Sequence, residues 1–200
     1  MFPEITRDDI FRLETDRLWL RWPRAADVDA IVRYANDPEV ALKTAVIPYP
    51  YARHDAETFV LRARGENARG ESLYLALSPK RQPNDVLGMI SLHSADLRGA
   101  GTLGFVLGRE AWNRGLMTEA ARAFVDLVFT ITCLQEIVSS ALPSNLASLR
   151  VLEKLGFVKT GTAVVHWPAR GGELTVQKTA LRRAAAQSLF GARRQRLAFN

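Results

Sequence analysis

Residues 111–129, AWNRGLMTEAARAFVDLVF, contain the turn and the helix around which the rest of the chain is organised. The segment begins as a turn around Gly115 and continues as an amphipathic helix, with apolar residues on one face and charged residues on the other. The apolar run TLGFVL at 102–107 precedes the turn and predicts a strand. In the order strand, tight turn, helix, the first N–H groups of the helix stay unpaired beyond the end of the strand.

A turn of this kind can bind an anion. Its free N–H groups carry partial positive charge that the helix dipole reinforces, Gly115 would let a phosphate approach the backbone, and Arg114 could add a full charge. Most strand–glycine–helix turns, however, only change the direction of the chain. The turn alone therefore leaves a phosphate site and a purely structural turn both open.

Length and composition indicate one globular domain. The chain has 200 residues, of which 48% are hydrophobic and 24% charged, which is enough to bury a substantial core. Five of its positive charges lie in a terminal segment without acidic residues: Arg182, Arg183, Arg193, Arg194 and Arg196. Without them the net charge of +6 falls close to neutral, so the basic character belongs to a tail and not to a binding face of the domain.

The single cysteine and the N-terminus both indicate a cytoplasmic protein. One cysteine, Cys133, excludes an intramolecular disulfide and fits a reducing compartment. Because it lies in an apolar context after the central helix, we expect it to be buried and not catalytic. The N-terminus has no apolar signal-peptide core, and no apolar run approaches the roughly 20 residues that a membrane span requires, so we expect no membrane association.

Before the central helix, the patterns predict an antiparallel meander with two helices inserted in it. The expected strands are 17–22, 72–77, 86–93 and 102–107. The expected helices cover about 28–35 and 56–64, the second of them ending at Gly65. Residues 43–53 contain two prolines among two tyrosines and are expected to form an aromatic loop.

After the central helix, the run EIVSSA at 136–141 predicts a strand parallel to 102–107, because a crossover helix joins the two. Two parallel strands end at the same edge of a sheet, where open α/β architectures bind ligands. Asn145 then begins a further helix as its N-cap, which by itself explains the residue, and Gly156 ends that helix. Residues 157–163 and 173–181 are expected to form a last hairpin around the loop at 167–172.

Three segments of the chain resemble the GNAT N-acetyltransferase superfamily, and more closely its RimJ/RimL-like branch of ribosomal-protein N-terminal acetyltransferases. They are LETDRLWLRW at 13–22, GREAWNRGLMTEA at 108–120 and PSNLASLRVLEKLGFVKTG at 143–161. The resemblance implies a mixed α/β fold, with a mostly antiparallel sheet of about seven strands, a splayed parallel pair at its centre and about four flanking helices. It spans roughly residues 12–181, so we expect a GNAT domain at 1–181 and a dispensable basic tail at 182–200.

The same resemblance implies that acetyl-CoA lies between the two parallel strands, with no metal involved. The first strand would hold the pantetheine arm through the backbone of Phe105, Val106 and Leu107. The turn would hold the pyrophosphate, and its residues are Asn113, Arg114, Gly115, Leu116, Met117 and Thr118. Asn145 would contact the arm of the cofactor in addition to capping its helix.

The chain departs from the superfamily at two points. The usual turn is Arg/Gln-x-x-Gly-x-Gly/Ala, whereas this chain has Trp112, Gly115 and Met117 in those places and keeps only the middle glycine. Main-chain donors hold the ligand, so the departure is tolerable. Many relatives also carry a tyrosine seven residues after the asparagine, where this chain has Leu152. Ser148 is the acid that the RimL-like pattern offers instead, although a first-turn serine that bonds only to the backbone explains it equally well.

Acetyl transfer also needs a base and an oxyanion donor. A strand N–H near Val106 could stabilise the oxyanion. The resemblance implies a base on the strand after Gly156, where the nearest titratable residue is His166, with Glu173 and Glu110 in reserve. A histidine beside Trp167 is also explained as a surface or packing residue.

We therefore expect an N-acetyltransferase that works by direct attack of an amine in a ternary complex. A peptide α-amino group, with a pKa near 8, is an easier acceptor than a lysine near 10.4, and a small-molecule amine is the other candidate. A homodimer is possible, and the tail could contact an acidic or RNA-rich partner. The alternatives are a catalytically silent acyl-CoA sensor on the same fold and a nucleic-acid-binding protein that uses the arginine tail, which the near-neutral body disfavours.

Overall fold

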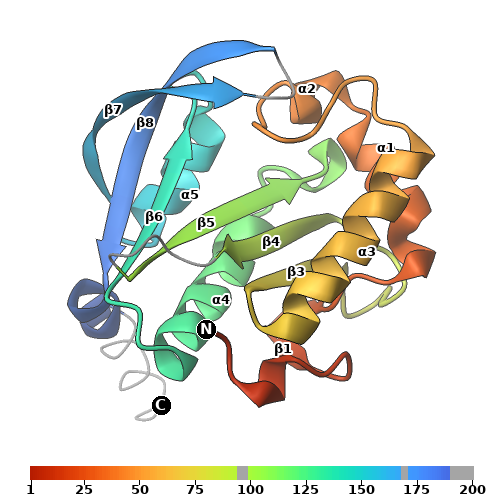
Figure 1. The fold of residues 1–200 in the computed structure, drawn as a ribbon, viewed down its shortest axis with the longest axis horizontal. Helices are drawn as coiled ribbons and strands as arrows, with labels where there is room; N and C mark the ends of the chain where they lie inside the picture. Colours follow the sequence, from red (N-terminus) through yellow and green to blue (C-terminus); the bar gives the residue numbers. More distant parts are fainter. Residues whose placement is uncertain (94–98, 168–170, 190–200) are drawn as a thin grey trace.

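Residues 1–93, 99–167 and 171–189, which the computed structural model describes, fold around one open sheet of eight strands (Figure 1). The order across the sheet is β1-β2-β3-β4-β5-β6-β8-β7. The strands are β1 (Arg12–Glu14), β2 (Leu18–Arg21), β3 (Ser72–Pro79), β4 (Gly88–His93), β5 (Ala100–Leu107), β6 (Glu136–Ala141), β7 (Val158–Trp167) and β8 (Gly172–Arg182). Within the described residues, only β5 and β6 pair in parallel. The expected mixed sheet with one parallel pair is confirmed.

Helices cover both faces of this sheet. They are α1 (Val28–Ala35), α2 (Pro38–Ala41), α3 (Arg53–Arg69), α4 (Leu116–Ile131) and α5 (Leu146–Lys154). Short 3-10 turns lie at Glu4–Thr6, Ala25–Asp27 and Arg109–Ala111. Helices α1 and α3 lie over β3 and β4 on one face, and α4 lies on the opposite face (Figure 1).

The two cores follow from the alternation of side chains along the strands. Leu73, Leu75 and Leu77 of β3 pack in the core that contains α4, whereas Ala76 packs in the core that contains α1 and α3. The apolar face of α4 is buried as its periodicity predicts, with Phe124 fully inaccessible. The central strand β3 is thus buried on both faces, and it holds the sheet between two helical layers.

Helix α3 is longer than the sequence predicts. It continues through Gly65 to Arg69, although a glycine in a helix interior costs about 1 kcal/mol relative to alanine. Asn67, in the last turn, is buried and makes hydrogen bonds of 2.8 and 2.9 Å to the backbone N–H and C=O of Tyr74. These bonds tie the last turn of the helix to β3, which explains why the helix does not stop at Gly65.

Cys133 is exposed, so the expectation that it is buried was wrong. It lies between the end of α4 and the start of β6, where Leu134 and not Cys133 takes the buried position. An apolar sequence context therefore did not predict which side chain of this short connection points inward.

The start of the tail packs on the domain. Residues 183–189 are helical, and Arg183 donates from Nε to the carbonyl of Leu134 at 2.7 Å, from Nη2 to that of Thr132 at 2.7 Å, and from Nη1 to that of Phe129. Ala186 is 1% exposed. The expected partner of the tail depends largely on residues 190–200, which lie outside the described residues.

Within the described residues, none of the helices combines the length and the apolar character that a membrane crossing requires.

Candidate active site

Strands β5 and β6 separate at the centre of the sheet. Their pairing covers only Ala100 to Thr102 on β5 and Glu136 to Val138 on β6, whereas β5 continues to Leu107 beside β4. At the point of separation, the Ser139 hydroxyl donates to the carbonyl of Leu103 at 2.9 Å. This bond replaces the next backbone pair and leaves the carboxyl-terminal half of β5 open on one edge.

The turn after β5 presents free backbone N–H groups to this opening. Asn113 and Gly115 have positive φ angles of 58° and 73°, and the Trp112 indole donates to the carbonyl of Leu107 at 2.7 Å. The first turn of α4 closes with a bond from the Glu119 N–H to the carbonyl of Gly115 at 3.0 Å. The N–H groups of residues 116–118 therefore have no intrahelical acceptor and carry the positive end of the helix dipole.

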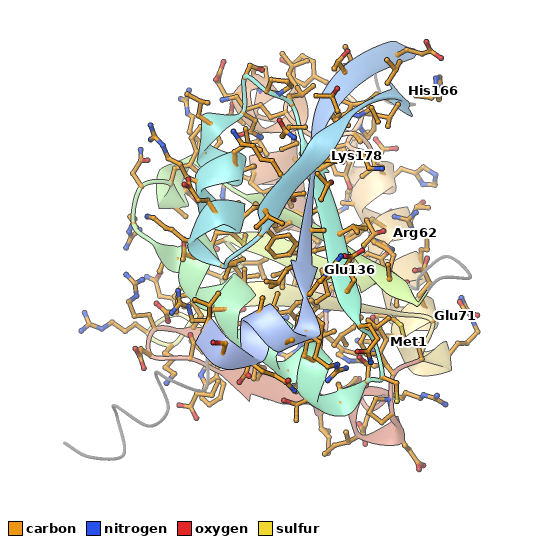
Figure 2. All side chains as sticks on the ribbon, turned by 90° about the vertical axis from the view of Figure 1, so that its left-hand side faces the viewer. Met1, Arg62, Glu71, Glu136, His166 and Lys178 are labelled. Carbon is orange, nitrogen blue, oxygen red and sulfur yellow. The ribbon has the colours of Figure 1, made fainter. Side chains whose placement is uncertain are left out.

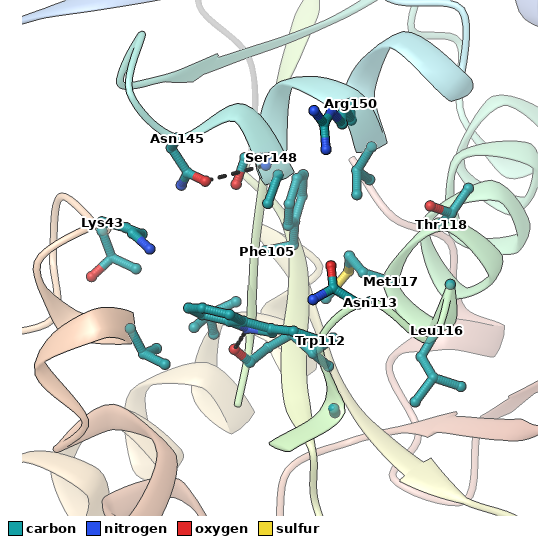
Figure 3. Close-up of a pocket in the computed structure, with 18 of the residues that line it drawn as sticks. Lys43, Phe105, Trp112, Asn113, Leu116, Met117, Thr118, Asn145, Ser148 and Arg150 are labelled. Carbon is teal, nitrogen blue, oxygen red and sulfur yellow. Dashed lines mark hydrogen bonds between the residues drawn. The ribbon is translucent and has the colours of Figure 1, made fainter. Parts of the chain in front are cut away.

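A cleft of about 330 Å³ lies between this turn, β5 and the start of α5 (Figure 3). Nearly all the cofactor residues expected from the sequence line it: Phe105, Val106, Leu107, Asn113, Gly115, Leu116, Met117, Thr118 and Asn145. Arg114 does not line the cleft; its side chain is exposed, and its carbonyl accepts a 2.9 Å hydrogen bond from Arg17. The turn thus offers main-chain donors, without the extra charge expected from Arg114.

Three basic residues that sequence reasoning missed line the same cleft: Lys43, Arg150 and Lys154. The Lys43 ammonium lies 4.8 Å from the centroid of the Trp112 ring. Arg150 and Lys154 are four residues apart on α5, so the sequence indicates that they share a helix face. Only the structure shows that this face lines the cleft. Free N–H groups surrounded by ammonium and guanidinium groups fit the phosphates of CoA.

The turn is also held from behind by residues that precede β2. Arg17 forms a 2.6 Å ion pair with Glu119 in the first turn of α4, and the Thr15 hydroxyl donates to the same carboxylate at 2.6 Å. Burial opposes ionisation of Glu119, but the hydrogen bonds from Thr15 and Arg17 outweigh it and lower the pKa of the carboxyl. The Arg17 charge is therefore neutralised by Glu119 and serves to fix the turn.

A second cavity of about 750 Å³ lies on the side of the sheet that carries α1 and α3, and it includes residues of β6 and the end of β7. The two hollows share lining residues at the point where β5 and β6 separate: Lys43, Thr44, Phe105, Val106, Asn145 and Ser148. The cofactor cleft and this cavity therefore adjoin at these residues.

Asn145 and Ser148 lie at the junction of the two hollows. The Asn145 side-chain oxygen accepts a 3.2 Å hydrogen bond from the backbone N–H of Ser148, so the N-cap role is confirmed. Because the oxygen serves the cap, the amide NH₂ of Asn145 is the group available to the cofactor arm. Ser148 borders both hollows, as a donor to a leaving thiolate would have to.

The residues expected to supply the base lie elsewhere. His166 is exposed near the end of β7 (Figure 2) and pairs with Glu173 of β8. Its neighbour Trp167, in contrast, is buried and lines the large cavity. Among the described residues that line the two hollows, His166, Glu173 and Glu110 are absent. The base role of His166 stays a prediction, and its placement disfavours it, because successive side chains of a strand point to opposite faces.

The large cavity contains polar groups that sequence reasoning passed over. They are His54, Asp55, Arg62, Glu66, Tyr74, Ser91 and His93. The His93 ring lies between two hydroxyls, with Tyr74 Oη at 3.3 Å from Nδ1 and Ser91 Oγ at 3.1 Å from Nε2. In the sequence, these two residues of β4 could have been recognised by their alternation with apolar neighbours in the run 86–93, which places Ser91 and His93 on one face of the strand.

Comparison with known proteins identifies the family. Residues 17–158 match the family model described as an acetyltransferase (GNAT) domain. An uncharacterized N-acetyltransferase p20 of Bacillus licheniformis is 28% identical over 160 residues, which are 80% of this chain and 89% of that protein.

Solved structures share the fold. A ribosomal-protein-S5-alanine acetyltransferase from Vibrio fischeri has a TM-score of 0.73 at 21% identity, covering 86% of this chain and 97% of that chain. RimL, a ribosomal L7/L12 alpha-N-protein acetyltransferase in complex with coenzyme A, has a TM-score of 0.76 at 17% identity, covering 88% and 99%. The chain described here belongs to the GNAT acetyltransferases, and it is an enzyme that transfers an acetyl group from acetyl-CoA to an amine.

Proposed function

We propose that the enzyme acetylates the α-amino group of a polypeptide by direct attack on acetyl-CoA in a ternary complex. The observation that carries this proposal is that the cofactor cleft and the 750 Å³ cavity share lining residues where β5 and β6 separate. A thioester at that point would be open to an amine from the other face of the sheet. No covalent intermediate on the protein is then required.

The charges of the cavity favour an acceptor with one amine over a polyamine. Lys43 and Arg62 face the cavity together with two carboxylates, Asp55 and Glu66. Glu66 lies 3.9 Å from Arg62, and Asp55 accepts a 2.8 Å hydrogen bond from the backbone N–H of Ala52. Among the described lining residues there is thus no surplus of negative charge for a second ammonium group.

An α-amino group also suits the chemistry better than a lysine side chain. Its pKa near 8 leaves a fraction of it neutral at pH 7, whereas a lysine near 10.4 is almost fully protonated. The likeness in fold to an alpha-N-protein acetyltransferase supports the same class of acceptor. A small-molecule amine is the second candidate, because the cavity is large enough to enclose one.

Ser148 and the backbone of β5 take the remaining roles in this proposal. Ser148 would protonate the departing thiolate, and an N–H of β5 near Val106 would stabilise the oxyanion. Ser148 and Val106 each border both hollows. Leu152, where many relatives have a tyrosine, is 1% exposed and offers no proton.

The test is a screen of acetyl acceptors with release of the CoA thiol as the readout. The panel contains tetrapeptide amides that differ in their first residue, matched peptides with a blocked N-terminus and an internal lysine, polyamines and single-amine small molecules. We expect turnover with a subset of the free N-termini and none with their blocked counterparts. Turnover confined to small amines, or binding of acetyl-CoA without turnover of any free N-terminus, would refute the polypeptide acceptor.

A further inference from the structure

Three polar side chains form a hydrogen-bonded row across β3 and β4, on the face that carries α3. Tyr74 of β3 lies opposite Ser91 of β4, and His93 is the next residue of β4 on the same face. Tyr74 Oη and Ser91 Oγ lie 3.3 and 3.1 Å from the two nitrogens of His93. Both nitrogens of one imidazole are therefore engaged by hydroxyls that could pass a proton.

One end of this row lies where β5 leaves β6. Ser91 pairs with Gly104, two residues beyond Thr102, the last residue of β5 that pairs with β6. The position that a Cβ on Gly104 would take lies 3.2 Å from Ser91 Oγ, so the absence of a side chain on Gly104 leaves the hydroxyl directly beside the backbone of β5. Ser91 and His93 both line the cavity assigned to the acceptor.

The surroundings of His93 keep its ring neutral near pH 7. Burial lowers the pKa of His93; on α3, the Glu66 carboxylate raises it and Arg62 lowers it. Burial raises the pKa of Tyr74 to about 12, with Arg62 opposing the shift and Glu66 adding to it, so the hydroxyl stays protonated. Two other neighbours of His93 carry no charge: Ser91 on β4, and Thr102, which pairs with His93 from β5.

We propose that Ser91 and His93 are the proton relay of the transfer, with Tyr74 as a positioning residue. This inference rests on the amine acetylation proposed above. In the relay, the Tyr74 oxygen accepts from Nδ1–H of His93, and Ser91 donates its hydroxyl proton to Nε2. A proton from the acceptor nitrogen passes to Ser91 Oγ while the serine hydroxyl proton passes to Nε2 of His93. Solvent then removes a proton from the His93 imidazolium.

The overall step balances without another reactant. The neutral amine nitrogen forms a bond to the acetyl carbon, the carbon–sulfur bond breaks, and the electron pair leaves with the sulfur. An acceptor that enters as an ammonium ion loses one proton before the attack and one after it, and the thiolate takes up one. One proton per turnover is released to solvent.

Steady-state kinetics as a function of pH test the relay. The acceptor is the best tetrapeptide amide of the screen, and the variants are Ser91→Ala, Ser91→Thr, His93→Gln and Tyr74→Phe. In the wild type, log(kcat/KM) should gain one extra unit of slope below the pKa of His93, separately from the titration of the acceptor near pH 8. His93→Gln should lose this extra slope and about 100-fold in kcat/KM at pH 7, within the usual range for general bases.

The other variants distinguish a relay from a structural role. Ser91→Ala should also lose the extra slope of log(kcat/KM), and Ser91→Thr should keep it. Tyr74→Phe should keep the slope but change the pH below which it appears. Acetyl-CoA affinity by calorimetry should stay within about twofold in all four, since none of the three residues lines the cofactor cleft. His166→Gln tests the competing histidine: loss of the slope there, or its persistence in His93→Gln, would overturn the relay.

An acceptor-independent measurement separates failure of the relay from failure of the proposed function. In ¹⁵N-histidine-labelled protein, His93 should titrate below the ordinary value and its signals should shift when acetyl-CoA is added. A His93 that titrates like free imidazole and ignores acetyl-CoA would refute the relay even if peptides are acetylated. Absence of peptide turnover with a shifted, acetyl-CoA-sensitive His93 would refute only the choice of acceptor.

Discussion

Replacement of Gly115 by valine is the most direct test of the phosphate-binding turn. Gly115 has a φ of 73°, and an L-residue in the left-handed region costs roughly 1–2 kcal/mol. A Cβ at this position would meet Arg17 Nη2 at 3.6 Å, an ordinary contact, so the folded domain can accommodate the side chain. For a chain of this size, that strain should lower the Tm by about 2–8 °C.

The effect on acetyl-CoA binding should be larger than this strain implies. Valine strongly disfavours the positive φ of Gly115, so we expect the backbone to shift and the N–H groups of residues 116–118 to lose the arrangement that would bind the pyrophosphate. Hydrogen bonds to charged groups contribute about 1.5–3 kcal/mol each, and the loss of one of them raises the Kd roughly 10-fold to 150-fold. Isothermal titration with acetyl-CoA, beside a thermal melt, measures both quantities.

Gly99→Val is the matched control. Gly99 has nearly the same φ, 75°, and it does not line the cleft. Among the residues that the structure describes, none has a heavy atom within 4 Å of the added Cβ. This variant should show a comparable loss of Tm with unchanged affinity for acetyl-CoA. If Gly115→Val binds acetyl-CoA as tightly as the wild type, or if both variants lose affinity equally, the turn is not the pyrophosphate site.

Three further variants test the arm contact, the acid and the tail. Asn145→Asp keeps the N-cap but removes the amide donor, so acetyl-CoA affinity should fall about 3-fold to 10-fold with little change in Tm; unchanged affinity would show that the residue only caps the helix. Ser148→Ala should lower kcat about 10-fold to 100-fold and should not change the Kd of acetyl-CoA. The expected loss is at the low end of general-acid effects, because a thiol with a pKa near 8.5 is a good leaving group. A large change in that Kd would contradict the acid role. Arg183→Ala removes three hydrogen bonds to carbonyls in the last turn of α4 and in the connection that follows it. This variant should cost about 2–3 kcal/mol in the free energy of unfolding measured with urea. Arg182→Ala, whose side chain is 84% exposed, should cost almost nothing, and equal effects of the two would speak against packing of the tail.

The unit strand–turn–helix–strand was readable from the sequence because each of its signals is local. The 3.6-residue period of 116–131, the glycine turn before it and the apolar run 136–141 all depend on residues a few positions apart. The parallel pairing of β5 and β6 follows from the crossover helix that joins them. These features predict a turn that can bind an anion, and the resemblance to the GNAT superfamily predicts acetyl-CoA there. Nearly all of the residues expected to contact it line one cleft.

Which side chains meet in the large cavity, where we propose that the acceptor binds, was decided by the tertiary structure alone. Tyr74, Ser91 and His93 meet only because β3 and β4 pair in one register and α3 covers that face. From the sequence, His166 is the nearest titratable residue on the strand after Gly156. The pleat of β7, however, points His166 away from the cavity that Trp167 lines. Which side chain faces a site is set by strand register and by the layer above the strand, and both are contacts between segments far apart in sequence.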